Sequence, residues 1–296
     1  MRHDVTVVIR SCRERTVPLC RELLKLQVPE DSIHTIEVSP FSAAVRKTFE
    51  LGLADRKKWT LAVDGDVLLY PGAVEEHVRR ALTFGPKLYS YQGHIKDKIF
   101  GNYRGAGLHL FNNKYLDKGL AALEVVKDSL RPESGTYREL AKQGYITIVD
   151  KVVYALHDYH QHYEDLFRKA YFHSKKHAGS GSTIQLMTNW RKHVAKDDDF
   201  KVLFYGWAYG CSDCKPVIND RDFFKQITAA EFPKIGLKEK EAIHIDTDHW
   251  TEILQRHKED SQHQKLNVTR LPRTWLWQRT HTVKSMVKQF KLRKSG

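Results

Sequence analysis

The chain has 296 residues, of which 41% are hydrophobic and 29% charged, and it carries a formal charge of +13 with a pI near 9.4. This composition excludes a disordered tail protein and a fibrous protein, and the sequence contains no run of 18 apolar residues that would predict a membrane-spanning helix. At about 100–200 residues per domain, the length predicts one large domain, or one domain with an extension.

The number of cysteines and the N-terminal residues indicate the cellular compartment of the protein. Four cysteines (Cys12, Cys20, Cys211 and Cys214) are too few to staple a chain of this length, which favours a reducing compartment. The first residues lack the layout of a signal peptide, so we expect a cytoplasmic protein. Cys211 and Cys214 form a single C-x-x-C pair, for which incidental or structural cysteines are the default interpretation and a zinc knuckle is the lesser alternative.

The excess positive charge is concentrated at the C-terminal end. Residues 261–296 contain nine Lys or Arg and no acidic residue, so +9 of the +13 lies there and +4 remains for the first 260 residues. Apolar residues at helical spacing follow two tryptophans in this tail: Trp275, Trp277, Val283, Met286, Val287 and Phe290. A basic amphipathic helix of this kind favours an anionic membrane surface, although a helix docked on the protein body has the same pattern.

Strand and helix patterns alternate along the first half of the chain. Continuous apolar or β-branched runs predict buried strands, and apolar residues three or four positions apart predict helices. We expect strands over residues 5–9, 32–38, 59–63 and 87–92, and helices over residues 13–27, 41–53 and 71–83. This order predicts an α/β fold with a mainly parallel sheet that is covered on both faces.

The second half is mixed and then mostly helical. We expect strands over residues 108–111, 145–149 and 152–156 and helices over residues 133–143, 160–177, 183–193 and 220–227. Asp248 is expected to cap a further helix that reaches residue 257.

The chemical signal that decides the interpretation is Asp64-Gly65-Asp66, which directly follows the strand over residues 59–63. Ligands of open α/β sheets bind at the carboxyl ends of the strands. Mg²⁺ and Mn²⁺ prefer oxygen ligands, and nucleoside diphosphates reach proteins through such ions. Gly65 would let a ligand approach the backbone. The same three residues are also common in plain turns, so the tripeptide alone does not distinguish a ligand site from a turn, and the neighbouring sequence is needed.

Those surroundings resemble the GT-A fold glycosyltransferases, especially the large family 2 group. The resemblance lies in Val5-Thr6-Val7-Val8-Ile9-Arg10, Ser42-Ala43-Ala44-Val45-Arg46-Lys47 and Leu61-Ala62-Val63-Asp64-Gly65-Asp66, and it covers about residues 1–180. It implies that Asp64, Gly65, Arg10 and Arg46 contact the sugar nucleotide and that Asp66, with Asp64 beside it, holds Mn²⁺ or Mg²⁺ on the diphosphate.

Two further residues match the spacing of that family. Glu133 lies eleven residues before Gly144-Tyr145, where the resemblance implies a catalytic base, but Ser134 replaces the second member of the usual acidic pair. A carboxylate there could take the proton of an acceptor hydroxyl. It could equally be a favourable first-turn residue of a helix.

His157 lies thirteen residues after Gly144, where the resemblance implies a third metal ligand, with Asp158 in support. In the next segment the resemblance implies that Arg168 and Lys169 offset the charge of the leaving diphosphate. A solvated basic helix face is the alternative for these two residues.

The sequence therefore predicts a metal-dependent, hexosyltransferase-type glycosyltransferase domain over residues 1–180 and a mostly helical extension over residues 181–296, with its basic tail at 261–296. By resemblance, the donor is a nucleotide-diphosphate sugar such as a UDP-sugar, and inversion is the expected stereochemistry. The acceptor would be a glycan or a lipid-linked intermediate, with the protein peripheral at the inner membrane face. The alternatives are a glycosyltransferase acting on modified bases of viral DNA, and a non-catalytic protein on a transferase scaffold that binds nucleic acid or other anions.

Overall fold

The structure is a computed structural model, and it describes residues 1–129, 131–177, 181–213 and 221–263. Its strands are β1 (Val5–Arg10), β2 (Ile33–Ile36), β3 (Trp59–Asp64), β4 (Val67–Leu69), β5 (Leu88–Asp97), β6 (Asn102–Arg104), β7 (Leu108–Asn112) and β8 (Ile146–His157). Its helices are α1 (Val17–Lys25), α2 (Phe41–Ala54), α3 (Ala73–Ala81), α4 (Leu116–Val126), α5 (Pro132–Lys142), α6 (Tyr163–His177), α7 (Gly181–His193), α8 (Asp198–Ser212), α9 (Arg221–Glu231) and α10 (Thr247–His263).

One sheet organises the first half of the molecule, in the order β2-β1-β3-β7-β5-β8-β4, with β6 paired to β5. Strands β2, β1, β3, β5 and β8 run in one direction, because the pairs β1–β2, β1–β3 and β5–β8 are parallel and β7 is antiparallel to both β3 and β5. Strand β4 runs the other way along β8. The predicted α/β class is confirmed; the sheet is mixed, with five of its eight strands running in one direction.

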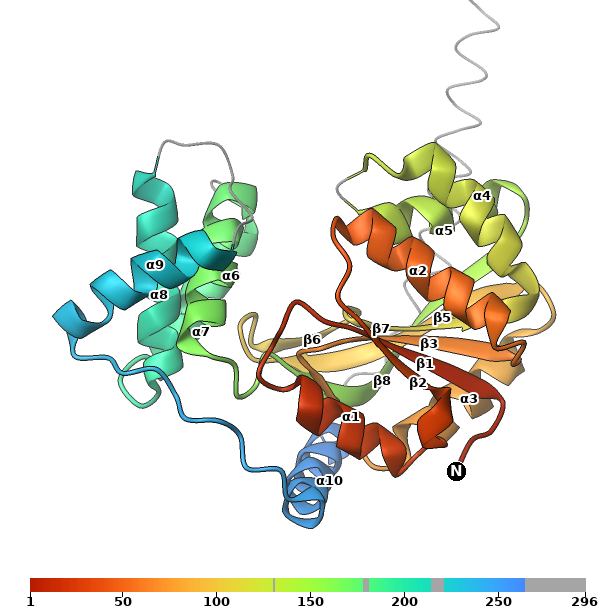
Figure 1. Ribbon diagram of the computed structural model, residues 1–296, viewed down its shortest axis with the longest axis horizontal. Coiled ribbons are helices and arrows are strands. Elements are labelled where there is room, and N and C mark those ends of the chain that lie inside the picture. Colours follow the sequence, from red (N-terminus) through yellow and green to blue (C-terminus); the bar gives the residue numbers. More distant parts are fainter. Residues whose placement is uncertain (130, 178–180, 214–220, 264–296) are drawn as a thin grey trace, which may run out of the picture.

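Helices cover both faces of this sheet (Figure 1). Helices α1, α3 and α10 pack with Val5, Val7 and Ile9 of β1 in one apolar core. Helices α2, α4 and α5 pack against the other face. Successive side chains of a strand point to opposite faces, so a strand covered on both sides has to be apolar throughout. That is why the run over residues 5–9 could be predicted as a buried strand.

The fold differs from the sequence-based expectation in three ways. The two strands expected over residues 145–149 and 152–156 are one long strand, β8, which begins at Ile146 and has irregularities of register in place of the expected break. Strands β4 and β6 and helices α4 and α8 were not expected. Both strands have only three residues, which is too short for a periodic signal. Asp246, rather than Asp248, caps α10, since its Oδ1 accepts the backbone N–H groups of Asp248 and His249 at 3.1 Å.

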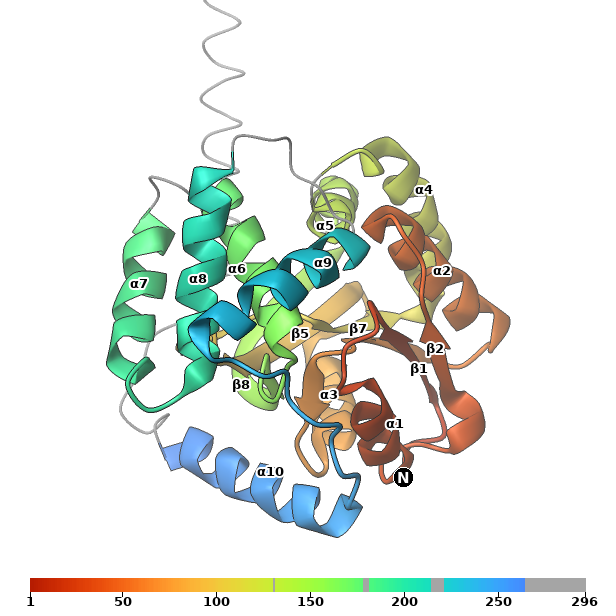
Figure 2. The ribbon, with the colours of Figure 1, turned by 60° about the vertical axis from the view of Figure 1, so that its left-hand side comes forward.

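Helices α6 to α9 form a second apolar cluster beside the sheet (Figure 2). Helices α6 and α8 approach closely, because a Cβ built on Gly206 would lie 2.4 Å from the carbonyl oxygen of Phe167 and one on Gly210 would lie 2.9 Å from that of Tyr171. The close approach fixes α6 and the side chains that it sends toward the sheet. The expected helical extension is confirmed, but this cluster already begins with α6, which lies before the proposed boundary at residue 180.

Helix α10 returns to the sheet side of the molecule. Trp250 and Leu254 are buried in the core that also contains α1 and β8. Lys258 Nζ donates to the carbonyl oxygen of Pro71 at 2.8 Å, and Ser261 Oγ lies 3.3 Å from the hydroxyl of Tyr70. The predicted tail beyond His263 lies outside the described residues, as does Cys214 of the C-x-x-C pair.

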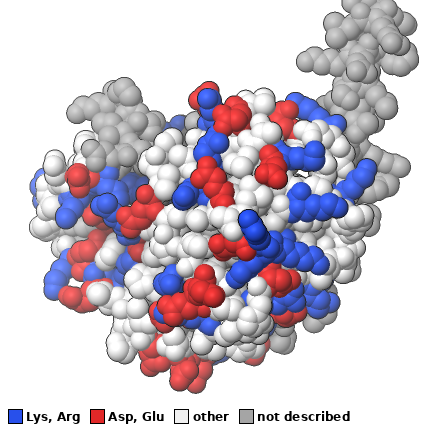
Figure 3. All heavy atoms as spheres, turned by 45° about the vertical axis from the view of Figure 1, so that its right-hand side comes forward, with Lys and Arg blue, Asp and Glu red and all other residues white. Residues whose placement is uncertain are grey.

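Acidic and basic side chains are intermixed over the face of the molecule drawn in Figure 3. This agrees with the small charge of the first 260 residues. Within the ranges that the structure describes, no helix is long and apolar enough to cross a membrane.

Candidate active site at the carboxyl edge of the sheet

Four parallel strands of the sheet each end on a polar side chain. The last residues of β1, β3, β5 and β8 are Arg10, Asp64, Asp97 and His157. Arg10 is in register with Asp64, and Asp97 is in register with His157. The carboxyl ends of parallel strands meet at one edge of a sheet, and that edge is where open α/β sheets bind ligands. The fold therefore gathers these groups in one place.

The turn after β3 is held by the chain itself. The backbone N–H of Gly65 donates to the carbonyl oxygen of Arg10 at 2.9 Å, and its own carbonyl accepts from Thr16 Oγ1 at 2.7 Å. A Cβ built on Gly65 would lie 2.6 Å from Val17 Cγ2 and 2.7 Å from Glu14 Oε2. Glu14 and the first residue of α1 therefore pack closely against this turn, which favours glycine at position 65; a ligand contact at Gly65 stays a prediction.

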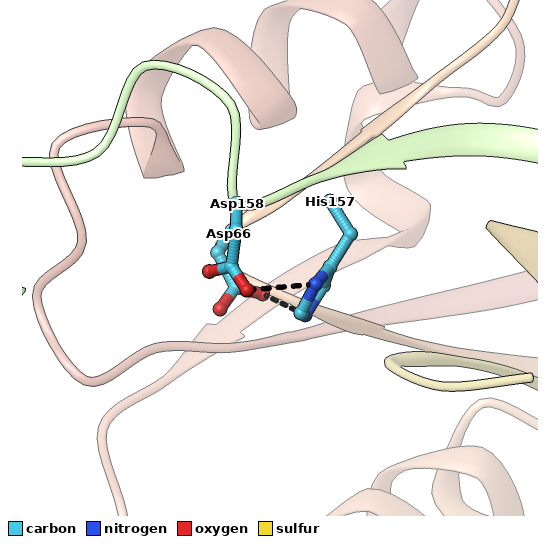
Figure 4. Close-up of side chains that lie close together, drawn as sticks. All are labelled: Asp66, His157 and Asp158. Carbon is cyan, nitrogen blue, oxygen red and sulfur yellow. Dashed lines mark ion pairs between the residues drawn. The ribbon is translucent and has the colours of Figure 1, made fainter. Parts of the chain in front are cut away.

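Asp66, His157 and Asp158 form a buried cluster, drawn in Figure 4. One ligand atom from each residue lies within 4.8 Å of the others. His157 Nε2 lies 3.4 Å from Asp66 Oδ1, and its Nδ1 lies 3.0 Å from both Asp158 Oδ2 and Asp97 Oδ2. Asp66 and His157 meet because Val67 of β4 is in antiparallel register with His157.

Lys169 completes this cluster from α6. Its ammonium group forms ion pairs with both Asp66 Oδ2 and Asp158 Oδ1. Burial alone would raise the pKa of the Asp66 carboxyl, but Lys169 and His157 outweigh it and hold that pKa below its usual value. Burial would likewise lower the pKa of His157, but the three carboxylates around it raise that pKa well above its usual value. The cluster is therefore a compact arrangement of buried, opposite charges.

The donor atoms of this cluster fit a divalent cation. Two carboxylates and one imidazole are a suitable ligand set for Mn²⁺. Asp66 Oδ1 is buried and has no hydrogen-bond partner, although it faces the imidazole. Asp97 and Asp158 engage Nδ1 of His157 and so leave Nε2 as the nitrogen directed at Asp66. The residues that would hold the ion are Asp66, His157 and Asp158, whereas Asp64, expected as a ligand, lies outside this group.

A second charged group lies around Arg10. Its Nε and Nη2 bind Asp64 Oδ1 at 2.8 and 2.7 Å, and its Nη1 binds Glu133 Oε1 at 2.5 Å. Glu133 Oε2 lies 3.3 Å from Nε2 of His109, whose Nδ1 lies 2.8 Å from the hydroxyl of Tyr137. Burial would raise the pKa of Glu133, but Arg10 and His109 outweigh it and lower that pKa. Glu133 is therefore held as an ionised carboxylate with both oxygens engaged.

The other expected site residues lie in different surroundings. Arg46 is half-exposed on α2 and pairs with Glu124, with no contact to Asp64 or Asp66 in the described part of the chain. Arg168 is buried on α6 and bonds Asp165 at 3.3 Å, an acid that also pairs with Arg221. Of the two basic residues expected on this helix, Lys169 reaches the acidic cluster directly and Arg168 is engaged within the helical part.

Sequence reasoning missed several residues at this edge. Asp97 and His109 gave no signal, because each lies in a segment with no recognisable motif and reaches the site only through the register of the sheet. Glu14 lies beside Gly65, and burial together with the negative charge of Asp66 raises its pKa to about 7. Asp158 was expected only in support of His157, although its carboxylate belongs to the cluster itself.

Solved structures of three other proteins are similar to this chain at low identity. A glycosyltransferase involved in glycosylation of the major capsid of PBCV-1 has 13% identity and a TM-score of 0.38, over 52% of this chain and 92% of its own. A cytidylyltransferase from Leptospira borgpetersenii has 12% identity and a TM-score of 0.37, over 66% of this chain and 96% of its own. A mannosyltransferase from Pyrobaculum calidifontis, in complex with GDP-Man and Mn²⁺, has 13% identity and a TM-score of 0.32, over 90% of this chain and 88% of its own.

All three proteins are transferases by their names, the enzyme class expected of this chain. No protein-family model and no curated protein matches the chain. Because every TM-score is below 0.5, these likenesses describe architecture, and any assignment of function has to rest on the site itself.

Proposed function

We propose that this protein is a glycosyltransferase that moves a sugar from a nucleotide-diphosphate sugar to a hydroxyl group of an acceptor. The observation that carries the proposal is that four parallel strands end on Arg10, Asp64, Asp97 and His157 at one edge of the sheet. Beside them lies a buried cluster whose ligand set fits Mn²⁺ or Mg²⁺. Cation-assisted binding of a diphosphate is the chemistry that this combination suits best.

In this proposal the acidic cluster around His157 and the charged group around Arg10 have different roles. Asp66, His157 and Asp158 would hold the divalent cation, which would supply charge stabilisation to the departing diphosphate. Asp64, oriented by Arg10, accepts hydrogen bonds from the ribose or base side of the donor. Lys169 adds positive charge on the diphosphate side. Arg168 and Arg46 remain proposed donor contacts from the resemblance alone.

Glu133 is the proposed base in an inverting displacement. It would take the proton of the acceptor hydroxyl as that oxygen attacks the anomeric carbon. Its ion pair with Arg10 gives it a second possible role, because it also holds the guanidinium against Asp64. Kinetics of a Glu133 variant separate these two roles, as described in the Discussion.

Donor binding can be tested by thermal unfolding with a panel of sugar nucleotides, including UDP- and GDP-sugars, with and without Mn²⁺. A ligand at a hundredfold excess over its Kd stabilises the folded state by about 2.7 kcal/mol. We expect one donor to stabilise the protein only when Mn²⁺ is present, and the Asp66→Asn variant to lose that gain. Asp128→Asn, at an exposed position, is the matched control. Equal stabilisation of Asp66→Asn and wild type would refute the cation site.

The location of the acceptor is a separate part of the proposal. The charge of +9 over residues 261–296 supports an anionic membrane surface, where a glycan or lipid-linked acceptor could lie. Flotation of the full chain with anionic and with neutral vesicles tests this proposal, and Lys→Gln changes at Lys284, Lys288 and Lys291 should weaken the association. Strong, salt-dependent binding to duplex DNA without flotation would favour a nucleic acid acceptor instead.

A further inference from the structure

The ammonium group of Lys169 lies between the two carboxylates that the cation would need. Its Nζ pairs with Asp66 Oδ2 and with Asp158 Oδ1, and all three side chains are largely shielded from water. Carboxylates buried in this way are stable only when a positive charge accompanies them. In the structure, Lys169 provides such a charge to both carboxylates through Asp66 Oδ2 and Asp158 Oδ1, while His157 faces their other oxygens.

Lys169 reaches the cluster from a different part of the molecule. Asp66 and Asp158 follow strands of the sheet, whereas Lys169 lies on α6, whose apolar side belongs to the second cluster. A lysine has a long flexible stem and a compact charge, so it can exchange partners without movement of its helix. Asp64 beside Arg10 and Asp97 beside His157 are instead fixed by the register of the strands.

We propose that Lys169 is an internal counter-ion that competes with the divalent cation for Asp66 and Asp158. This inference deepens the proposed function, because it gives the cation site a built-in competitor. The cation alone must displace Lys169 and therefore binds weakly. When a nucleoside diphosphate is present, its phosphates offer Lys169 another partner, and the cation binds more tightly. By linkage, the cation must then strengthen binding of the diphosphate by the same factor.

The experiment measures Mn²⁺ affinity by electron paramagnetic resonance of the full chain, without any nucleotide. We expect Lys169→Gln to bind Mn²⁺ at least about fivefold more tightly than wild type, within the range of about 5- to 150-fold that is usual for such coupling. Lys169→Arg, which keeps the charge, should remain close to wild type. Lys175→Gln is the matched control, since Lys175 lies on the same helix and pairs with the backbone carbonyl of Asp213 instead.

Thermal unfolding provides the second measurement. Without Mn²⁺ the Lys169→Gln variant leaves two buried carboxylates without their lysine partner, so its Tm should fall. Added Mn²⁺ should then raise its Tm by more than it raises the Tm of wild type. A smaller rise, or an Mn²⁺ affinity equal to or weaker than that of wild type, overturns the proposal.

The failure of this inference can be told apart from the failure of the proposed function. If Lys169→Gln gains Mn²⁺ affinity and no sugar nucleotide binds either protein, the counter-ion role stands and the transferase role falls. If a sugar nucleotide binds with Mn²⁺ and Lys169→Gln gains no Mn²⁺ affinity, only the counter-ion role falls. If neither protein binds Mn²⁺, the counter-ion role also falls.

Discussion

Asp97 Oδ2 lies 3.0 Å from Nδ1 of His157, and the two residues are register partners at the carboxyl ends of β5 and β8. The carboxylate therefore fixes the imidazole ring with Nε2 toward Asp66. Partners of this kind orient metal-binding histidines and raise their basicity. Asp97 has no exposed side-chain surface and also binds Arg104 Nε at 2.6 Å, so its position is fixed from two sides.

Asp97→Asn should weaken Mn²⁺ binding by about 10- to 100-fold, because the amide no longer holds His157 as a charged partner does. Isothermal titration with Mn²⁺ measures this loss. Asp150→Asn is the control, since Asp150 is a partly buried acid on β8 that pairs with Arg80 at 2.7 Å, away from the cluster. Unchanged Mn²⁺ affinity in Asp97→Asn would remove the support role.

Glu133→Gln distinguishes a base from a positioning residue. If Glu133 is the base, kcat should fall by about 10²- to 10⁴-fold while the donor KM changes little. If it acts only by holding Arg10 against Asp64, the donor KM should rise and kcat should change less. Glu139→Gln controls for the helix, because Glu139 lies on α5 and pairs only with Lys142 among the described residues. Wild-type kinetics in Glu133→Gln would exclude both roles.

The contribution of His77 to stability should decrease as the pH falls below neutrality. His77 is fully buried against Tyr154 and Tyr91, with ring centroids 3.8 and 5.2 Å away, and burial lowers its pKa to about 3. The unfolded chain takes up a proton near pH 6.5, whereas folded His77 stays neutral. Its contribution is therefore complete above about pH 6.5 and is lost as the pH falls toward 3, by up to about 1.4 kcal/mol per pH unit.

Denaturant unfolding between pH 7.5 and pH 5 tests this expectation. His77→Phe keeps an aromatic ring and removes the titrating group, so its free energy of unfolding should change less steeply with pH. Burial also lowers the pKa of His160, to about 4, so part of the slope should remain in the variant. Identical slopes for the two proteins would mean that His77 does not contribute.

Gly206→Ala should destabilise the protein although alanine is the better helix former. The new methyl group would lie 2.4 Å from the carbonyl oxygen of Phe167, and this backbone atom can move only if α6 and α8 separate. Overpacking costs about 1–3 kcal/mol, against a gain of about 1 kcal/mol from helix propensity. Chemical unfolding measures the balance, and Ala208→Leu, at an exposed position of the same helix, should have little effect. A stabilised Gly206→Ala would contradict the close approach.

The elements that sequence reasoning predicted are those with strong local patterns. The run of apolar and β-branched residues in β1, the amphipathic α2 and the turn Asp64-Gly65-Asp66 each carry their signal within a few residues. The short strand β4 carries none, yet it brings Asp66 beside His157 through pairing with β8. Asp97 lies beside His157 because of the sheet register, and Lys169 reaches the same cluster because of how α6 packs. Neither the register nor the packing can be predicted from a single sequence.

The return of α10 has a consequence for how the chain can be divided. A polypeptide that ended at residue 180 would lack Trp250 and Leu254, and it would expose the apolar surface of α1 and β8 that these side chains cover. It would also lose α8, against which α6 packs through Gly206 and Gly210. Limited proteolysis should therefore fail to release a stable fragment of residues 1–180, because α10, the last described helix, completes the core that contains α1 and β8.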